Sequence, residues 1–263
     1  LSGLQHTGGT SIALTEDTDL TGVDLGDVPF SLRVADGATL TLSAAQADGR
    51  TITGEGSVVV TNPAASPNAD LSGLGASSTV TVTDDQSGAL FRGDLGSVSV
   101  SIASGGALAL AASSASGVAI ANAGTLSVSE LAGMPAGDFS GISGEGTATA
   151  AVARNLTFTG DLGPLALNGA SGVTFTASAA ALDGIDASGA GAVAVTGLGA
   201  SPSADLSGLA SDLVAIAVSS TAIFAGTLPA GAVVTVADGA SLTAPAAKLA
   251  GVLVTGQGEV TAT

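Results

Sequence analysis

The sequence has no cysteine, tryptophan or tyrosine, and it holds only one histidine and one methionine in 263 residues. Without cysteine, disulfides and thiolate metal sites are excluded, and cysteine usage does not identify the compartment. Hydrophobic residues make up 46% of the chain, but only six of them are phenylalanine. Ala, Val, Leu and Gly therefore supply the apolar volume, and such small side chains favour the thin core of a narrow solenoid.

Charged residues are also scarce, at 10%, against roughly a quarter in typical soluble domains. Low charge combined with high apolar content excludes intrinsic disorder. The chain has 22 acidic and 5 basic residues, a formal net charge of −17. This charge opposes binding to nucleic acids and to anionic membrane surfaces, whereas it attracts cations and favours solubility. No apolar run reaches about 18 residues, so we expect no membrane-spanning helix.

Two short sequence phrases recur about 67 residues apart. The first, which we call the corner phrase, has the form Asp-(Leu/Phe)-Ser-Gly-(Leu/Ile) and occupies residues 70–74, 138–142 and 205–209. The second, which we call the Phe-x-Gly phrase, continues with Asp-Leu or Thr-Leu and occupies residues 91–95, 158–162 and 224–228. Internal repeats of this kind indicate stacked structural units that grow without one central core.

The spacing divides the chain into four copies that follow one another without linkers. They run approximately over residues 1–69, a copy with a partial start, and then 70–137, 138–204 and 205–263. Because the sequence shows no capping element at either end, we expect the array to continue beyond an end or to be capped by association.

Small polar and apolar residues alternate at 11–15, 39–42 and 79–83, the period-2 pattern of half-buried strands. Each copy is expected to hold six or seven short strands, and residues 43–48 and 244–250 are the most plausible short helices. A β-helix rung takes roughly 20–25 residues, so a copy equals about three rungs. We therefore predict an all-β, parallel β-solenoid (β-helix) of about twelve rungs, continuous over residues 1–263. The alternative is a string of β-sandwich domains, which usually carry a large aromatic core residue that is absent here.

The aspartates of the recurring phrases have two interpretations. In the first, the corner phrase is a turn in which Gly adopts an unusual dihedral angle and the Asp and Ser side chains bind turn amides. In the second, the aspartates are calcium ligands; calcium needs six to eight oxygen atoms, so neighbouring rungs would have to contribute. The repeat-toxin calcium motif Gly-Gly-x-Gly-x-Asp is absent. The calcium candidates are Asp24, Asp70, Asp94, Asp138, Asp161 and Asp205.

Enzymatic function is not expected. The only histidine is His6, so a catalytic triad or a histidine-based metal site is not predicted. The closest carboxylate pairs are Asp84 with Asp85 and Asp183 with Asp186. Polysaccharide-active β-helix enzymes use such pairs together with aromatic platforms and clustered basic residues, which this chain lacks. Ice binding through a threonine array is a further alternative, but the threonines of one copy are replaced by alanine in the next.

Residues 36–42, Asp-Gly-Ala-Thr-Leu-Thr-Leu, and 52–61, Ile-Thr-Gly-Glu-Gly-Ser-Val-Val-Val-Thr, carry a family resemblance. This pattern resembles repeats of bacterial surface-layer and adhesin-type extracellular proteins. The resemblance implies an exported, structural protein at the cell surface that associates with itself, with calcium a candidate cofactor and no catalytic residue. The alternative function is an adhesin that binds a glycan or another surface ligand, for which cell-surface polysaccharide is the candidate partner.

Overall fold

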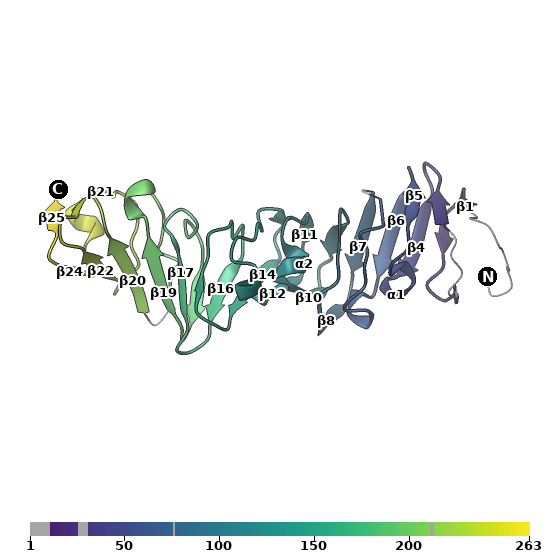
Figure 1. Cartoon of the computed structure of the whole chain (residues 1–263), viewed down its shortest axis with the longest axis horizontal. Helices are drawn as coiled ribbons and strands as arrows, with labels where there is room; N and C mark the ends of the chain where they lie inside the picture. The colour runs from purple at the N-terminus through teal and green to yellow at the C-terminus, as the bar shows by residue number, and fades with distance from the viewer. Residues whose placement is uncertain (1–10, 26–30, 76, 211–212) are drawn as a thin grey trace. The chain divides into compact units, whose positions relative to one another are not determined.

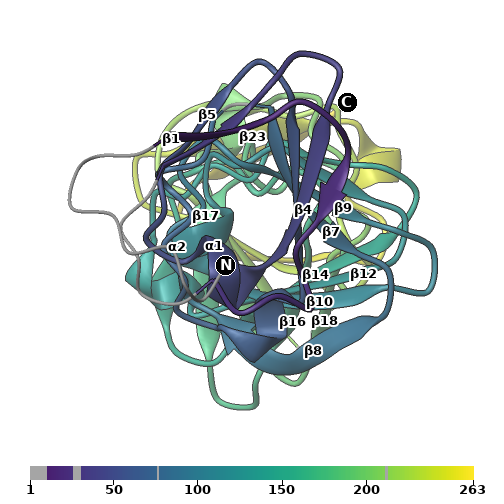
Figure 2. The same ribbon diagram turned by 90° about the vertical axis from the view of Figure 1, so that its right-hand side faces the viewer.

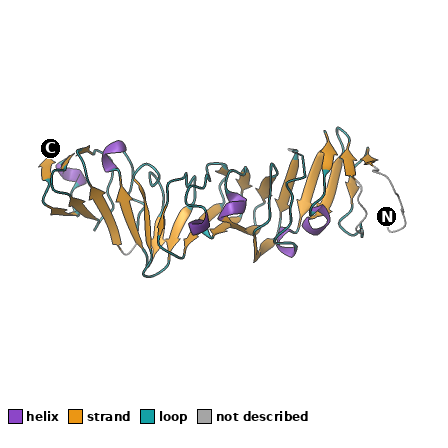
Figure 3. Ribbon diagram, in the orientation of Figure 1, coloured by secondary structure: helices purple, strands orange, loops and turns teal. Residues whose placement is uncertain are grey.

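The computed structural model describes residues 11–25, 31–75, 77–210 and 213–263. Parallel strands stack into a β-solenoid of about 12 turns, with few helices, which confirms the predicted fold class (Figure 3). The chain forms two compact units: the first comprises Leu1–Ser127 with Gly141–Ala148, and the second comprises Val128–Ser140 with Thr149–Thr263. The single continuous solenoid over residues 1–263 stays a prediction.

The first unit contains two sheets that lie wholly within it. Figure 2 shows β4, β7 and β9 of the larger sheet in neighbouring positions. The three-stranded sheet has the order β1 (Ser11–Leu14), β3 (Ser31–Val34) and β5 (Ile52–Gly54). The seven-stranded sheet has the order β2 (Thr18–Asp19), β4 (Thr39–Ser43), β6 (Ser57–Thr61), β7 (Ser78–Val82), β9 (Ser99–Ile102), β11 (Ile120–Asn122) and β13 (Ile142–Ser143). A further parallel pair joins β8 (Asp85–Phe91) to β10 (Ala107–Ala111).

The second unit repeats this arrangement with its own sheets. Figure 1 shows the strands of its six-stranded sheet lying side by side. That sheet has the order β15 (Leu156–Thr157), β17 (Thr174–Ser178), β19 (Ala192–Thr196), β20 (Leu213–Val218), β22 (Val233–Val236) and β24 (Leu253–Gly256). A three-stranded sheet contains β21 (Ala222–Ile223), β23 (Ser241–Ala244) and β25 (Glu259–Ala262), and β16 (Ala166–Gly169) pairs with β18 (Ala187–Gly189). The boundary between the units falls within β12 (Thr125–Ser129) and β14 (Thr147–Val152).

Helical structure is limited to single turns. Ser43 begins α1 with a capping box, in which its hydroxyl accepts from the Gln46 amide while the Gln46 side chain accepts from the Ser43 amide. Short helices are confirmed within both predicted stretches, 43–48 and 244–250. The helices are α1 (Ala44–Ala47), α2 (Ala112–Ala115), η1 (Pro63–Ala65), η2 (Leu131–Gly133), η3 (Leu198–Ala200) and η4 (Ala246–Lys248).

The length of a turn explains how sequence copies map onto sheets. Strand partners in register are 17 to 22 residues apart, as for Thr149 with Ala166 and Ile120 with Ile142. With about 20 residues per turn, a copy of about 67 residues spans about one third more than three turns. Equivalent strands of successive copies therefore fall in different sheets. These strands are β4, β10, β17 and β23.

The core follows from the alternation of the strands. In β4, Leu40 and Leu42 point inward and are fully buried, whereas Thr39 and Thr41 are half-exposed. The largest fully buried side chains of the described chain include four phenylalanines. Phe158 stacks between two other rings, with centroid distances of 6.3 Å to Phe139 and 5.9 Å to Phe175. These rings are the largest side chains of a core that otherwise consists mainly of Ala, Val, Leu and Ile.

Candidate functional site

In each corner phrase, the aspartate accepts two hydrogen bonds from the serine two residues later. Asp70 Oδ1 accepts from the Ser72 amide at 3.0 Å and from the Ser72 hydroxyl at 2.6 Å. The turn is therefore closed by its own side chains, which is the first of the two interpretations of the phrase. The same two contacts join Asp138 to Ser140 and Asp205 to Ser207.

The glycine of the corner phrase lies directly against the preceding turn. A Cβ atom on Gly73 would lie 2.4 Å from the Arg50 carbonyl oxygen. No side chain fits at such a distance, so the position requires glycine because of close approach between turns. At the equivalent positions, an added Cβ would lie 2.5 Å from the Val118 carbonyl oxygen at Gly141 and 2.8 Å from the Ile185 carbonyl oxygen at Gly208. The unusual dihedral angle predicted for this glycine is wrong, because Gly73, Gly141 and Gly208 do not have positive φ.

The Phe-x-Gly phrase packs against the corner phrase of the preceding turn. A Cβ on Gly160 would lie 1.9 Å from the Gly137 carbonyl oxygen, and Gly137 directly precedes the corner-phrase aspartate. The backbone continues this contact, because the Phe139 amide donates to the Asp161 carbonyl at 2.8 Å. The two recurring phrases thus hold adjacent turns together. The same close approach occurs in the other copies. An added Cβ would lie 2.0 Å from the Ala69 carbonyl oxygen at Gly93 and 2.1 Å from the Ala204 carbonyl oxygen at Gly226.

The hydrogen bonds of the corner stabilise the ionised carboxylates. The Ser72 hydroxyl, followed by the Ser72 amide, lowers the pKa of Asp70 below its ordinary value. Ser140 and Ser207 lower the pKa values of Asp138 and Asp205 in the same way, and the positive charge of Lys248 adds to the effect at Asp205. These aspartates are fully exposed, so the shifts report local hydrogen bonding rather than burial.

We expect the folded state to lose stability as the pH falls through the folded-state pKa values of the corner aspartates, which lie below the ordinary pKa of aspartate. Because those values are lowered on folding, protonation favours the unfolded chain. The stabilisation is fully present above the unfolded-state pKa and is lost as the pH falls through the folded-state pKa. The triple variant Ser72→Ala, Ser140→Ala, Ser207→Ala should show a shallower acid dependence. Thermal unfolding measured by circular dichroism between about pH 2 and pH 7 checks this. Equal acid dependence for the wild type and the triple variant would contradict it.

Four of the six calcium candidates lie in pairs on adjacent turns. Asp70 is the bridge partner of Asp94, and Asp138 is the bridge partner of Asp161, whereas Asp205 faces Thr227. Asp24 lies just after the turn that follows β2. Within the described ranges, no three His, Asp or Glu residues gather closely enough to hold a metal ion. Calcium binding stays the alternative interpretation of these six aspartates.

The carboxylate pairs considered for catalysis are engaged in turns. Asp85 Oδ1 accepts from the Ser87 amide and hydroxyl, and Asp84 accepts from the Gln86 side chain at 3.0 Å. Asp183 Oδ1 accepts from the Asp205 amide at 2.7 Å. Asp85 therefore makes the same two contacts as the corner aspartates, whereas Asp183 accepts from the backbone of the next turn. His6 lies outside the described residues.

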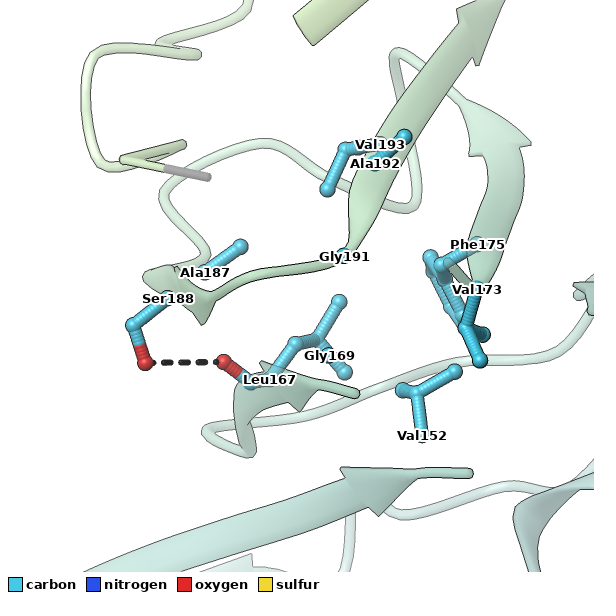
Figure 4. A pocket seen from close by; sticks show the side chains of 10 residues that line it. All are labelled: Val152, Leu167, Gly169, Val173, Phe175, Ala187, Ser188, Gly191, Ala192 and Val193. Atoms are coloured by element: carbon cyan, nitrogen blue, oxygen red, sulfur yellow. Dashed lines mark hydrogen bonds between the residues drawn. The ribbon is translucent and has the colours of Figure 1, made fainter. Parts of the chain in front are cut away.

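Two hollows occur in the second unit. The first, of about 10 Å³, has an apolar lining that includes Leu167, Phe175 and Val193, and its Ser188 hydroxyl donates to the Leu167 carbonyl at 3.3 Å (Figure 4). That volume holds about one water molecule. The second, of about 140 Å³, lies between η3 and residues 217–222. Neither lining contains a charged residue, so neither hollow brings together groups for acid–base chemistry.

The Gly-x-Gly turns recur at more than one place in the repeat. Gly54 and Gly144 are not equivalent positions, yet both have positive φ, 116° and 109°, and both abut a carbonyl of the preceding turn. Gly189 makes the same turn and was not recognised, although its Gly-x-Gly spacing was a usable signal. Buried Asn122 was missed as well; its Nδ2 donates to the Thr147 carbonyl at 3.0 Å, and no sequence signal distinguishes it from an outward polar residue.

Comparison with known proteins finds no family model, no curated protein and no solved structure that matches the chain. Among the helices of the described residues, none is long and apolar enough to cross a membrane.

Proposed function

We propose that the chain is a structural, self-associating component of a bacterial cell surface, in a surface layer, a filament or an adhesin stalk, and that it has no catalytic role. The proposal rests on the residues that recur at equivalent positions of successive copies. The retained residues are core residues, such as Phe158, or turn residues, such as Asp70 and Gly160. Each has a packing or hydrogen-bonding task within the solenoid.

The outward positions of equivalent strands are retained only in part. Thr39 and Thr41 of β4 are replaced by Ala107 and Ala109 in β10. Hydroxyl residues return in the third and fourth copies, as Thr174 and Thr176 of β17 and Ser241 and Thr243 of β23. A repeated catalytic or ligand-binding surface would need the same outward side chains in each copy. Retention of geometry with only partial retention of surface chemistry is the behaviour expected of a repetitive scaffold. The extracellular location rests on the composition, which is rich in Ser, Thr, Gly and Ala and free of cysteine.

Electron microscopy of the purified chain, with and without calcium, tests the proposal. We expect ordered sheets or filaments at high protein concentration. Analytical ultracentrifugation of the same samples measures the fraction of chain that has assembled. Stable monomers under both conditions, at every accessible concentration, would overturn the structural role.

A further inference from the structure

The outer surface of the six-stranded sheet in the second unit combines an absence of charge with outward apolar side chains. Its five longer strands, β17, β19, β20, β22 and β24, contain no charged residue. Cross-strand partners Ala194, Ala215, Val233 and Leu253 form a column on the outward side, which we call the apolar column. Leu253 is 58% exposed, and neighbouring Leu213 is 48% exposed.

Three hydroxyl groups beside the apolar column already have partners within the sheet. Thr196 Oγ1 donates to the Ala177 carbonyl at 3.3 Å, and Thr255 Oγ1 donates to the Val234 carbonyl at 3.3 Å. Thr235 and Thr255 lie within hydrogen-bonding distance of each other, at 3.2 Å. Hydroxyls that are satisfied internally can lose their water without leaving unpaired donors, so the burial of these three groups is inexpensive.

The absence of charge and the apolar column indicate which class of partner fits this face. A polysaccharide would place hydroxyls against Ala194, Ala215 and Val233, which offer no hydrogen-bonding side chain, and its own groups would lose water without compensation. A cationic partner would bind the acidic turns instead of this face. A second copy suits it well: with a net charge of −17, two chains repel each other except where they meet through uncharged surface.

From these contacts we infer that the outer face of β17, β19, β20, β22 and β24 binds the same face of a second copy of the chain. The inference rests on the proposed self-association and names the surface that mediates it. The contact is isologous, so the apolar column of one copy packs on that of the other around a twofold axis. Two such faces pack about 10 Å apart, as sheets do in sandwiches.

The size of the face sets the strength of this contact. Five strands about 4.8 Å apart, each about four residues of 3.3 Å, cover roughly 300 Å². A stable dimer buries about 800 Å² per partner, so a single contact of this size is weak. Weak contacts of this kind persist when many are made at once, as in a lattice or a filament.

Because the chain has no native cysteine, single engineered cysteines can report on the contact. Ala215 lies near the middle of the apolar column and is half-buried. Ala166, half-buried on β16 of another sheet in the same unit, provides a matched control. Treated with a short bismaleimide cross-linker, Ala215→Cys should form covalent dimers about tenfold faster than Ala166→Cys, because association raises the local thiol concentration. Adding Val233→Glu to Ala215→Cys should abolish the difference, whereas Val233→Thr should preserve it.

Equal cross-linking of Ala215→Cys and Ala166→Cys would overturn the inference. So would retention of the wild-type chain on purified bacterial cell-wall polysaccharide that is lost in Val233→Glu, because the face would then bind a glycan. The outcomes separate the two proposals. Assembly in the microscope without selective cross-linking at residue 215 removes this inference and leaves the structural role intact. Selective cross-linking without any larger assembly supports the face contact and contradicts the structural role.

Discussion

Phe158→Ala is expected to lower the free energy of unfolding of the second unit by about 3–5 kcal/mol, the usual cost of emptying a phenylalanine site in a packed core. Phe158 is 1% exposed and stacks on two rings, Phe139 and Phe175. A core made otherwise of small side chains has little that can move into the space. Urea unfolding followed by circular dichroism, together with hydrogen exchange of β17 amides, measures the loss.

Phe224→Ala is the matched control. Phe224 is fully buried in the same unit, and it has no ring partner among the described residues. The difference between the two variants should therefore report the ring contacts, at about 0.5–1.5 kcal/mol per pair. A Phe158→Ala variant no less stable than Phe224→Ala would show that stacking adds nothing to burial. Phe158→Leu, which conserves most of the volume, should cost less than about 1.5 kcal/mol.

Gly160→Ala is the second substitution with a large expected effect, about 3 kcal/mol of destabilisation. The added Cβ would lie 1.9 Å from the Gly137 carbonyl oxygen, and its three nearest atoms all belong to the backbone. No side-chain rotation can relieve the contact, so the two turns must separate at the corner. The free energy of unfolding, measured in urea, checks the prediction.

Gly133→Ala serves as the control because it should change stability in the opposite direction. Gly133 closes η2, and nothing lies within 4 Å of an added Cβ there. Replacing a glycine by alanine in an unstrained position stabilises by about 0.4–1 kcal/mol, because the unfolded chain loses freedom. If Gly160→Ala behaved like Gly133→Ala, the close approach of the two recurring phrases would not be a structural requirement.

The fold was predictable because its signals are local. Alternation in Thr39-Leu40-Thr41-Leu42 shows which residues point inward, and the repeat shows that the pattern continues along the chain. The assignment of equivalent strands to different sheets was not predictable. It depends on the remainder when a copy of about 67 residues is divided by turns of 17 to 22 residues, and the individual turn lengths are set by packing.

The corner was predictable in part. Asp70, Ser72 and Gly73 suggest a turn from their types alone, and the structure confirms the hydrogen bonds and the close approach. The contact between the two recurring phrases is long-range, so no sequence spacing shows it. Ser78 illustrates another limit: its hydroxyl is buried and has no partner among the described residues, because strand alternation points it into the core.

The central claim is that the corner aspartates set geometry through hydrogen bonds made by the protein itself. Thermal unfolding of the wild-type chain in millimolar calcium and in excess chelator tests it most directly, with Asp70→Asn, Asp138→Asn, Asp205→Asn as the comparison. An ion bound only by the folded state at about 100 times its dissociation constant would stabilise it by about 2.7 kcal/mol. We predict the same unfolding temperature with and without calcium. A rise in calcium that disappears in the triple variant would contradict the account and establish these aspartates as calcium ligands.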